Sequence, residues 1–231
     1  MTMLCIAHRG GPGPENSLEA IRRSLAMGAP AIEIDVWQLH DELWVTHDRR
    51  LGREIAGYEV LSDLSRDHLE ALRLSNGEHL PRLSQVLELV GERALLNIEL
   101  KGPDCVDALV RILTAHRQNT GQSHDSWIVS SFDHCQLAQL QQRLPEVRRG
   151  LLLYGVPLDL AQSADRIDAY SVHLSQDFMP EALIEDIRQR GRKVWIYTAN
   201  HPKDWRRLME AGVDGIFTDH PDGLMRYLAE N

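Results

Sequence analysis

Short apolar runs alternate with longer amphipathic stretches along the whole chain. The runs are rich in Val, Ile and Leu, and their length is typical of buried strands. They predict strands at 4–7, 31–37, 95–100, 127–130, 150–153, 169–172, 193–197 and 215–217. The stretches between and after them repeat their apolar residues at helical spacing and predict helices at 16–27, 83–91, 104–118, 133–143, 157–164, 180–190, 202–211 and 221–229.

Eight strand–helix units in 231 residues favour a (β/α)8 TIM barrel that forms one domain, 1–231. An open doubly wound sheet has the same alternation and is the alternative. No GxGxxG motif follows the first strand, which favours the barrel. The segment 38–82 breaks the alternation and is interpreted as an insertion after strand two, too small and too polar to form a core of its own.

Composition and charge exclude several classes of function. A hydrophobic fraction of 43% suits a globular core, and a net charge of −9 argues against a general nucleic-acid binder. No apolar run approaches the 18 residues that a membrane span needs, and we see no signal peptide. Cys5, Cys105 and Cys135 lie far apart, so we expect reduced thiols in a cytoplasmic protein. The oligomeric state is not readable from the sequence.

Acidic residues alternate with apolar residues inside two predicted strands. Glu33 and Asp35 share one face of the second strand, and Glu99 and Lys101 share one face of the third. The apolar residues between them suit the layer between barrel and helices, so the acids face inward. Three carboxylates from neighbouring strands form an oxygen site suited to Mg²⁺ or Ca²⁺. The alternative is a buried acid network paired with Arg9 and Lys101.

Two histidines are placed beside these acids by separate arguments. The first strand ends on His8, and a turn rich in Gly and Pro follows. A hairpin centred near Asp41 would pair position 36 with 46 and Asp35 with His47, which brings His47 to the level of the acids. Two imidazoles flanking a divalent cation suit phosphodiester cleavage, because one accepts the proton of the attacking oxygen and the other protonates the leaving alkoxide.

Six motifs together carry a resemblance to a known family. The chain contains HRG at 8, PEN at 14, EIDV at 33, VTHD at 45, NIELK at 97 and GVDGIFTDHP at 212. In this order, over nearly the whole chain, they resemble the glycerophosphodiester phosphodiesterase family of the phospholipase C-like barrel superfamily. The resemblance implies a barrel with a small insertion after strand two. It also implies metal-dependent hydrolysis of glycerophosphodiesters, such as glycerophosphocholine or glycerophosphoethanolamine, to sn-glycerol 3-phosphate and an alcohol.

The resemblance also implies roles for the basic residues. His8 and His47 match the family's acid–base pair, and Arg9 and Lys101 match its phosphate contacts. Which histidine acts first is left open. Direct attack by water and a cyclic phosphate intermediate are both left open as well.

The acidic residues are assigned in the same way. Glu33, Asp35 and Glu99 match the family's ligands for one divalent cation, and Glu15 and Asn16 match its Pro-Glu-Asn element. Mg²⁺ is favoured and Ca²⁺ is the alternative, because a cytosolic protein more often meets usable Mg²⁺. Glu15 either supports the site from behind or touches the ion.

One motif departs from the family pattern. Where the family usually has Trp-Thr-x-Asn near the end of strand seven, this chain has Tyr197-Thr198-Ala199-Asn200. We expect Tyr197 to replace the aromatic wall against the substrate, with Trp195 deeper on the same strand face. The alternative is that both rings only pack.

Two other functions stay open. One is a lipid-directed phosphodiesterase that acts on lysophospholipids. It would normally carry a membrane-facing apolar loop, and we see no apolar insertion. The other is a non-catalytic barrel that binds a phosphate ligand. The presence of all the catalytic positions counts against it.

Overall fold

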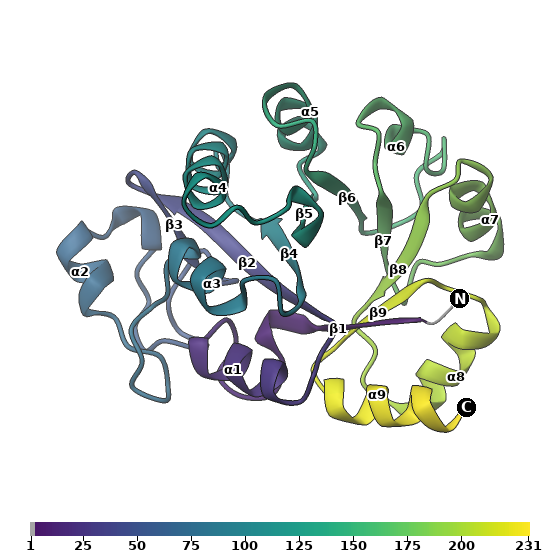
Figure 1. Ribbon diagram of the computed structural model, residues 1–231, viewed down its shortest axis with the longest axis horizontal. Coiled ribbons are helices and arrows are strands. Elements are labelled where there is room, and N and C mark those ends of the chain that lie inside the picture. Colours follow the sequence, from purple (N-terminus) through teal and green to yellow (C-terminus); the bar gives the residue numbers. More distant parts are fainter. Residues whose placement is uncertain (1–2) are drawn as a thin grey trace.

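Eight parallel strands close into a barrel surrounded by helices in the computed structural model, which describes residues 3–231 (Figure 1). The order around the barrel is β1, β2, β4, β5, β6, β7, β8, β9, and β9 pairs with β1 to close it. These strands are β1 (Leu4–Ala7), β2 (Ala31–Leu39), β4 (Leu95–Leu100), β5 (Trp127–Ser131), β6 (Arg148–Leu153), β7 (Ser171–Ser175), β8 (Lys193–Tyr197) and β9 (Gly215–Thr218). The predicted TIM barrel is confirmed, and the open sheet is wrong.

The helices follow the strands as expected, with one exception. They are α1 (Leu18–Ala26), α2 (Arg66–Ala71), α3 (Leu83–Val90), α4 (Val106–Thr120), α5 (His134–Arg143), α6 (Ser163–Arg166), α7 (Glu181–Gln189), α8 (Pro202–Glu210) and α9 (Pro221–Glu230). The helix predicted at 157–164 is wrong, because only α6 is α-helical there. Leu160 has a φ of 51°, a left-handed conformation that interrupts a right-handed helix.

The hairpin after strand two has a different register from the predicted one. β2 pairs with β3 (Glu42–Val45) so that Val36 lies opposite Val45, one position earlier than expected. The turn between them has only two residues, and its first residue, His40, has a φ of 56°. Two-residue hairpin turns favour such positive φ values because their twist matches that of the strands.

This shift would turn His47 away from the acids if the strand continued. It does not continue: β3 ends at Val45, and the backbone N–H of Thr46 makes a last bond to the carbonyl of Asp35 at 3.0 Å. His47 therefore lies in irregular backbone, where strand alternation no longer dictates its direction. The predicted register is wrong, although His47 still reaches the barrel mouth.

The segment after the hairpin has a small apolar cluster, contrary to expectation. This segment includes η2 (Leu61–Asp63) and α2, and it packs beside the hairpin (Figure 1). The cluster is formed by Leu39, Trp44, Ile55, Leu61, Leu69, Leu74 and Leu80. These residues are spread over the two hairpin strands, loops and short helices, so no single sequence periodicity revealed them.

Strand alternation fixes which side chains face the barrel interior. Ile32, Ile34 and Ile98 belong to the main core between strands and helices, while the acids on the same strands take the opposite phase. The carboxyl ends of the strands therefore gather the polar side chains at one mouth of the barrel. No helix among residues 3–231 combines the length and the apolar character needed to cross a bilayer.

Candidate active site

Three buried carboxylates meet at this mouth. Glu33 and Asp35 extend from β2 and Glu99 from β4, with Asp35 and Glu99 directly paired in register. Each offers an oxygen within 4.8 Å of the others, and the residues are only 2%, 1% and 9% exposed. Burial, followed by the charges of Asp35 and Glu99, raises the pKa of Glu33 well above its ordinary value. Burial and Asp35 raise the pKa of Glu99 to about 7.

This cluster fits a hard divalent cation. Its donors are all carboxylate oxygens, which suit Mg²⁺ or Ca²⁺ better than zinc. Glu33 Oε1 is buried and has no hydrogen-bond partner among residues 3–231, although a buried carboxylate oxygen normally has one. A cation there would offset the repulsion that raises both pKa values.

The first loop after β1 packs against the acids. Asn16 Nδ2 donates to Asp35 Oδ2 at 2.9 Å, and Asn16 Oδ1 accepts the Asp35 backbone N–H at 3.0 Å. The backbone N–H of Arg9 donates to Glu33 Oε2 at 2.8 Å. Gly11 allows this tight turn because its φ is 89° and a Cβ there would collide with the Ser24 hydroxyl. Asn16 therefore supports the cluster by fixing Asp35.

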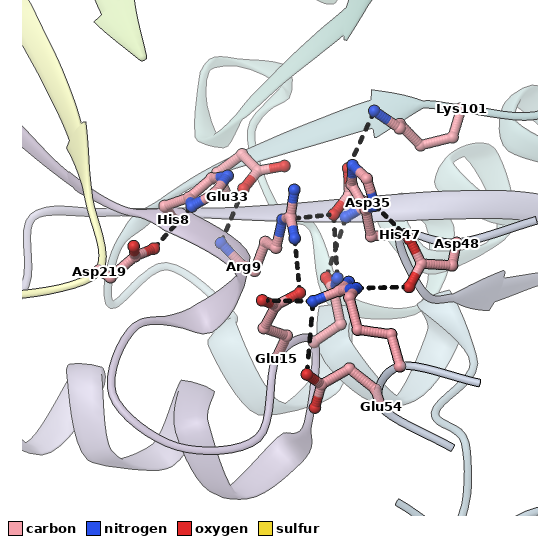
Figure 2. A network of polar contacts seen from close by, with 12 residues as sticks. His8, Arg9, Glu15, Glu33, Asp35, His47, Asp48, Glu54, Lys101 and Asp219 are labelled. Carbon is pink, nitrogen blue, oxygen red and sulfur yellow. Dashed lines mark hydrogen bonds and ion pairs between the residues drawn. The ribbon is translucent and has the colours of Figure 1, made fainter. Parts of the chain in front are cut away.

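His8 is held from the last strand of the barrel. Its Nδ1 lies 2.7 Å from Asp219 Oδ1 (Figure 2). Asn200 Nδ2 donates to the other oxygen, Asp219 Oδ2, at 2.6 Å. A carboxylate at Nδ1 leaves Nε2 as the reactive nitrogen. We did not predict Asp219, although it is the second Asp of the GVDGIFTDHP motif. Asn200 belongs to the departing Tyr-Thr-Ala-Asn stretch.

His47 has the same kind of anchor on the other flank. Its Nδ1 lies 2.8 Å from Asp48 Oδ1, and its carbonyl accepts the indole N–H of Trp37 at 3.1 Å. Burial lowers the pKa of His47 despite the nearby charge of Asp35. Asp48, the residue after His47 in the VTHD motif, is a second partner that we did not predict.

Two cations complete the charged side. Arg9 Nη1 donates to Glu15 Oε2 at 2.6 Å, and Arg9 Nε lies 3.6 Å from Asp35 Oδ2. Lys101 Nζ lies 2.9 Å from Glu99 Oε1, and the carboxylates raise its pKa although burial opposes the rise. The second oxygen of Glu15 lies 2.7 Å from Arg53 Nη1, so both carboxylate oxygens of Glu15 face arginines.

Opposite the charges, the cavity has an aromatic and apolar wall. Its volume is about 200 Å³, and Phe132, Leu152, Tyr197 and Phe217 line it together with the polar residues above. The Tyr197 hydroxyl donates to the carbonyl of Leu153 at 2.7 Å, and its ring meets Phe132 edge-on at 6.1 Å. Tyr197 therefore lines the cavity wall, and its contact with substrate stays a prediction.

Trp195 does not line this cavity. It is 2% exposed and stacks on His173, with ring centroids 4.8 Å apart. Trp195 faces the barrel interior like Tyr197 but lies two residues earlier on β8. At that depth its side chain is buried inside the barrel. The expected substrate contact of Trp195 is therefore wrong, and its packing role holds.

His173 is a buried residue that our prediction did not include. It reaches the cavity lining from β7, and its Nε2 lies 2.8 Å from the Ser171 hydroxyl. Burial lowers the pKa of His173 to about 3, so it stays neutral at physiological pH.

An apolar rim continues outward from the wall. It consists of Tyr154, Val156, Leu158 and Phe178, which follow β6 and β7 and are 71%, 47%, 106% and 37% exposed. Tyr154 and Phe178 meet edge-on at 5.1 Å. The sequence indicated no apolar insertion, and the rim shows that ordinary strand–helix loops supply apolar surface here instead.

The site combines buried carboxylates, imidazoles and cations at the carboxyl end of a (β/α)8 barrel. Phosphodiester hydrolysis needs these groups, which bind a divalent cation, transfer protons and stabilise negative charge. Comparison with known proteins agrees: the chain belongs to the Glycerophosphoryl diester phosphodiesterase family, whose model matches residues 8–223. It is a glycerophosphodiester phosphodiesterase by family, as the sequence predicted.

Known relatives resemble it over almost their full length. A glycerophosphodiester phosphodiesterase of Caldanaerobacter subterraneus subsp. tengcongensis is 32% identical, with 97% of each chain covered. A crystal structure of the Agrobacterium tumefaciens enzyme is 27% identical, with a TM-score of 0.76 over 98% of this chain and 99% of that one. An Oleispira antarctica phosphodiesterase in complex with the product sn-glycerol-3-phosphate is 23% identical, with a TM-score of 0.88 over 99% and 97%.

Proposed function

We propose that this enzyme hydrolyses small glycerophosphodiesters, such as glycerophosphocholine and glycerophosphoethanolamine, to sn-glycerol 3-phosphate and an alcohol. The observation that carries the proposal is the pair of anchored imidazoles on either flank of the buried acid cluster. The cavity of about 200 Å³ suits a glycerophosphate head rather than a polymer. The product bound to the Oleispira antarctica phosphodiesterase supports the same substrate class.

We assign one divalent cation to Glu33, Asp35 and Glu99, with Mg²⁺ favoured. When bound, it would neutralise charge on the phosphate oxygens and polarise the phosphorus. Arg9 and Lys101 lie beside the same acids and contribute positive charge toward the remaining non-bridging oxygens. Arg9 and Lys101 thereby stabilise the extra negative charge of a five-coordinate transition state.

The two imidazoles move the protons. Asp219 and Asp48 hold Nδ1 of His8 and His47, so each Nε2 is the exchanging atom. One Nε2 accepts the proton of the attacking oxygen, and the other donates a proton to the departing alkoxide. The lowered pKa of His47 suits the residue that begins the cycle neutral, which makes it the favoured base.

The test is release of glycerol 3-phosphate from glycerophosphocholine, with and without EDTA. We expect turnover in Mg²⁺ that EDTA abolishes and added Mg²⁺ restores. Glu33→Gln should remove it, while Glu88→Gln, an exposed acid on α3, should leave it unchanged. Release that is insensitive to EDTA would contradict the metal assignment, and no release from any glycerophosphodiester would contradict the function.

A lysophospholipid phosphodiesterase is a second candidate, favoured by the apolar rim. Tyr154 of the rim follows Leu153, whose carbonyl accepts the hydroxyl of Tyr197 on the cavity wall, so a single acyl chain attached to the glycerol could lie across the rim. A higher kcat/KM for lysophosphatidylcholine than for glycerophosphocholine would establish this candidate over the first.

The remaining expectations concern location and partners. The free cysteines, of which Cys5 and Cys105 are buried, support the prediction of a reducing, cytoplasmic setting. The oligomeric state has no prediction to test. Family membership favours an enzyme over the non-catalytic binding barrel, and measured turnover would decide between them.

A further inference from the structure

The part of the insertion that lies beyond His47 and Asp48 reaches the active site through Arg53. Its Nε donates to Asp48 Oδ2 at 2.7 Å, and its Nη1 lies 2.7 Å from Glu15 Oε1. A weaker contact, at 3.4 Å, joins Nη1 to its neighbour Glu54. Two nitrogens of one guanidinium thus bind carboxylates from two different loops.

Those two carboxylates are the ones that hold functional groups. Glu15 accepts a hydrogen bond from the guanidinium of Arg9, and Asp48 is hydrogen-bonded to the imidazole of His47. The contacts form an unbroken series from Arg9 through Glu15, Arg53 and Asp48 to His47. Figure 2 shows Glu15 and Asp48 facing each other across a shared cationic group, on the side away from Lys101.

The base of Arg53 is fixed by the insertion itself. The adjacent Gly52 donates its backbone N–H to the carbonyl of Ile55 at 2.8 Å, and Ile55 is buried in the insertion's apolar cluster. The guanidinium is a planar fork, so two carboxylates held by it have a defined separation and direction. A lysine in its place would supply one point charge and could not fix both.

Stability alone does not account for this arrangement. Arg53, Glu15 and Asp48 have side chains 43%, 31% and 30% exposed, and ion pairs exposed to this degree contribute little to folding. The two bonds instead restrict the orientation of carboxylates whose other oxygens orient the reacting groups. Small errors in such orientation are costly for rate.

We propose that Arg53 is a positioning residue through which the segment 49–82 aligns Arg9 for phosphate binding and His47 for proton transfer. This inference rests on the proposed function, because the roles of Arg9 and His47 belong to it. It makes the segment 49–82, and not only the stretch that carries His47, part of the catalytic apparatus.

The test measures kcat and KM for glycerophosphocholine separately. Arg53→Ala should lower kcat about tenfold through His47 and raise KM several-fold through Arg9, since orientation of each group is loosened. Glu15→Gln should affect mainly KM and Asp48→Asn mainly kcat. Combining either with Arg53→Ala should give less than the product of the single effects, because the residues act in one series.

Arg50→Ala is the matched control. Arg50 belongs to the same insertion and is exposed, but within the described residues 3–231 its guanidinium bonds only the insertion's own Tyr58 carbonyl, at 2.7 Å. Its kinetics should stay within about twofold of the parent. Arg53→Lys should recover only part of the loss. Full recovery with Lys, or an Arg53→Ala enzyme that behaves like Arg50→Ala, would overturn the inference.

Binding of inorganic phosphate separates this inference from the proposed function. Calorimetric titration in Mg²⁺ needs no turnover, and Arg53→Ala should weaken phosphate binding about threefold or more while Arg50→Ala does not. If the parent protein hydrolyses no glycerophosphodiester, the function fails, yet this difference still supports the alignment of Arg9. Equal phosphate affinity in the parent and Arg53→Ala proteins would overturn that alignment, whatever the activity.

Discussion

The two sides of the barrel mouth are built in opposite ways. On the side of β1, β2, β4 and the insertion, every reacting group has a fixed polar partner, as with His8 on Asp219 and His47 on Asp48. On the side of β5 to β8, the wall is aromatic and the rim, including Leu158, is exposed to solvent. Proton transfer and charge stabilisation need precise geometry, whereas contact with an alcohol or acyl group needs only apolar surface.

The difference predicts how each side responds to change. Substitutions on the charged side should alter the rate for every substrate, because all substrates share the phosphodiester. Substitutions on the apolar side should alter the choice among substrates and leave the chemistry intact.

The largest effect should come from removing one carboxylate of the cluster. Glu99→Gln should lower kcat/KM for glycerophosphocholine by about 10³-fold, because loss of a charged ligand removes several kcal/mol of stabilisation. A Mg²⁺ titration of activity should also shift to higher concentration. An unchanged titration would instead show that Glu99 is a structural acid paired with Lys101.

Removal of either imidazole should cost less. His8→Ala and His47→Ala should each lower turnover about 10²-fold or more by loss of proton transfer, with the fold retained by circular dichroism. His68→Ala, an exposed histidine on α2, is the control and should be neutral.

The same two variants can be told apart with a better leaving group. A glycerophosphodiester of nitrophenol needs little protonation of its leaving oxygen, so the variant that lacks the general acid should largely recover on it. We expect recovery for His8→Ala and not for His47→Ala. Recovery of His47→Ala alone would reverse the two roles.

The sequence predicted the charged side better than the apolar one. Alternation along β2 and β4 placed Glu33, Asp35 and Glu99 together, because a strand's side chains have only two directions. The predicted position of His47 rested on a wrong hairpin register. His47 still lies at the barrel mouth, because β3 ends before it and strand alternation no longer sets its direction. Trp195 was predicted on the correct strand face but too close to the substrate. The alternation of side chains along a strand shows which face a residue occupies, but not how deep in the barrel it lies.

Partners across long loops could not be predicted in the same way. His8 and Asp219 are 211 positions apart, and their contact exists only because β9 closes against β1. Arg53 lies in an irregular segment with no period to read. The rim around Leu158 arose where a predicted helix gave way to turns, and local conformations of that kind are set by the tertiary fold.

Cation binding should depend on pH by about tenfold per unit. Burial and Asp35 raise the pKa of Glu99 to about 7, so below that pH the cation-free protein holds a proton that Mg²⁺ must displace. Affinity should therefore rise with pH through about 7, by up to about tenfold per unit for each displaced proton.

Calorimetry in buffers of different ionisation enthalpy would count the released protons. The cation-free protein should also lose stability as pH rises from about 4.5 through 7. The pKa of Glu99 is higher in the folded protein than in the unfolded chain, so the folded state binds the proton more tightly, and this stabilisation is lost as the proton dissociates. Glu99→Gln should flatten both dependences. A Mg²⁺ affinity that is constant between pH 6 and 8 would contradict the buried acid cluster as the binding site.

The smallest effect should come from the rim. Leu158→Ser should leave kcat/KM for glycerophosphocholine within about twofold, because Leu158 touches none of the polar groups and is fully exposed. If an acyl chain lies on the rim, the same change should lower kcat/KM for lysophosphatidylcholine about fivefold, since partial loss of an apolar contact costs about 1 kcal/mol. Met27→Ser, an exposed apolar residue just after α1, is the control and should change neither value. Equal losses on both substrates would mean that the rim acts on the chemistry, and the division between the two sides would fail.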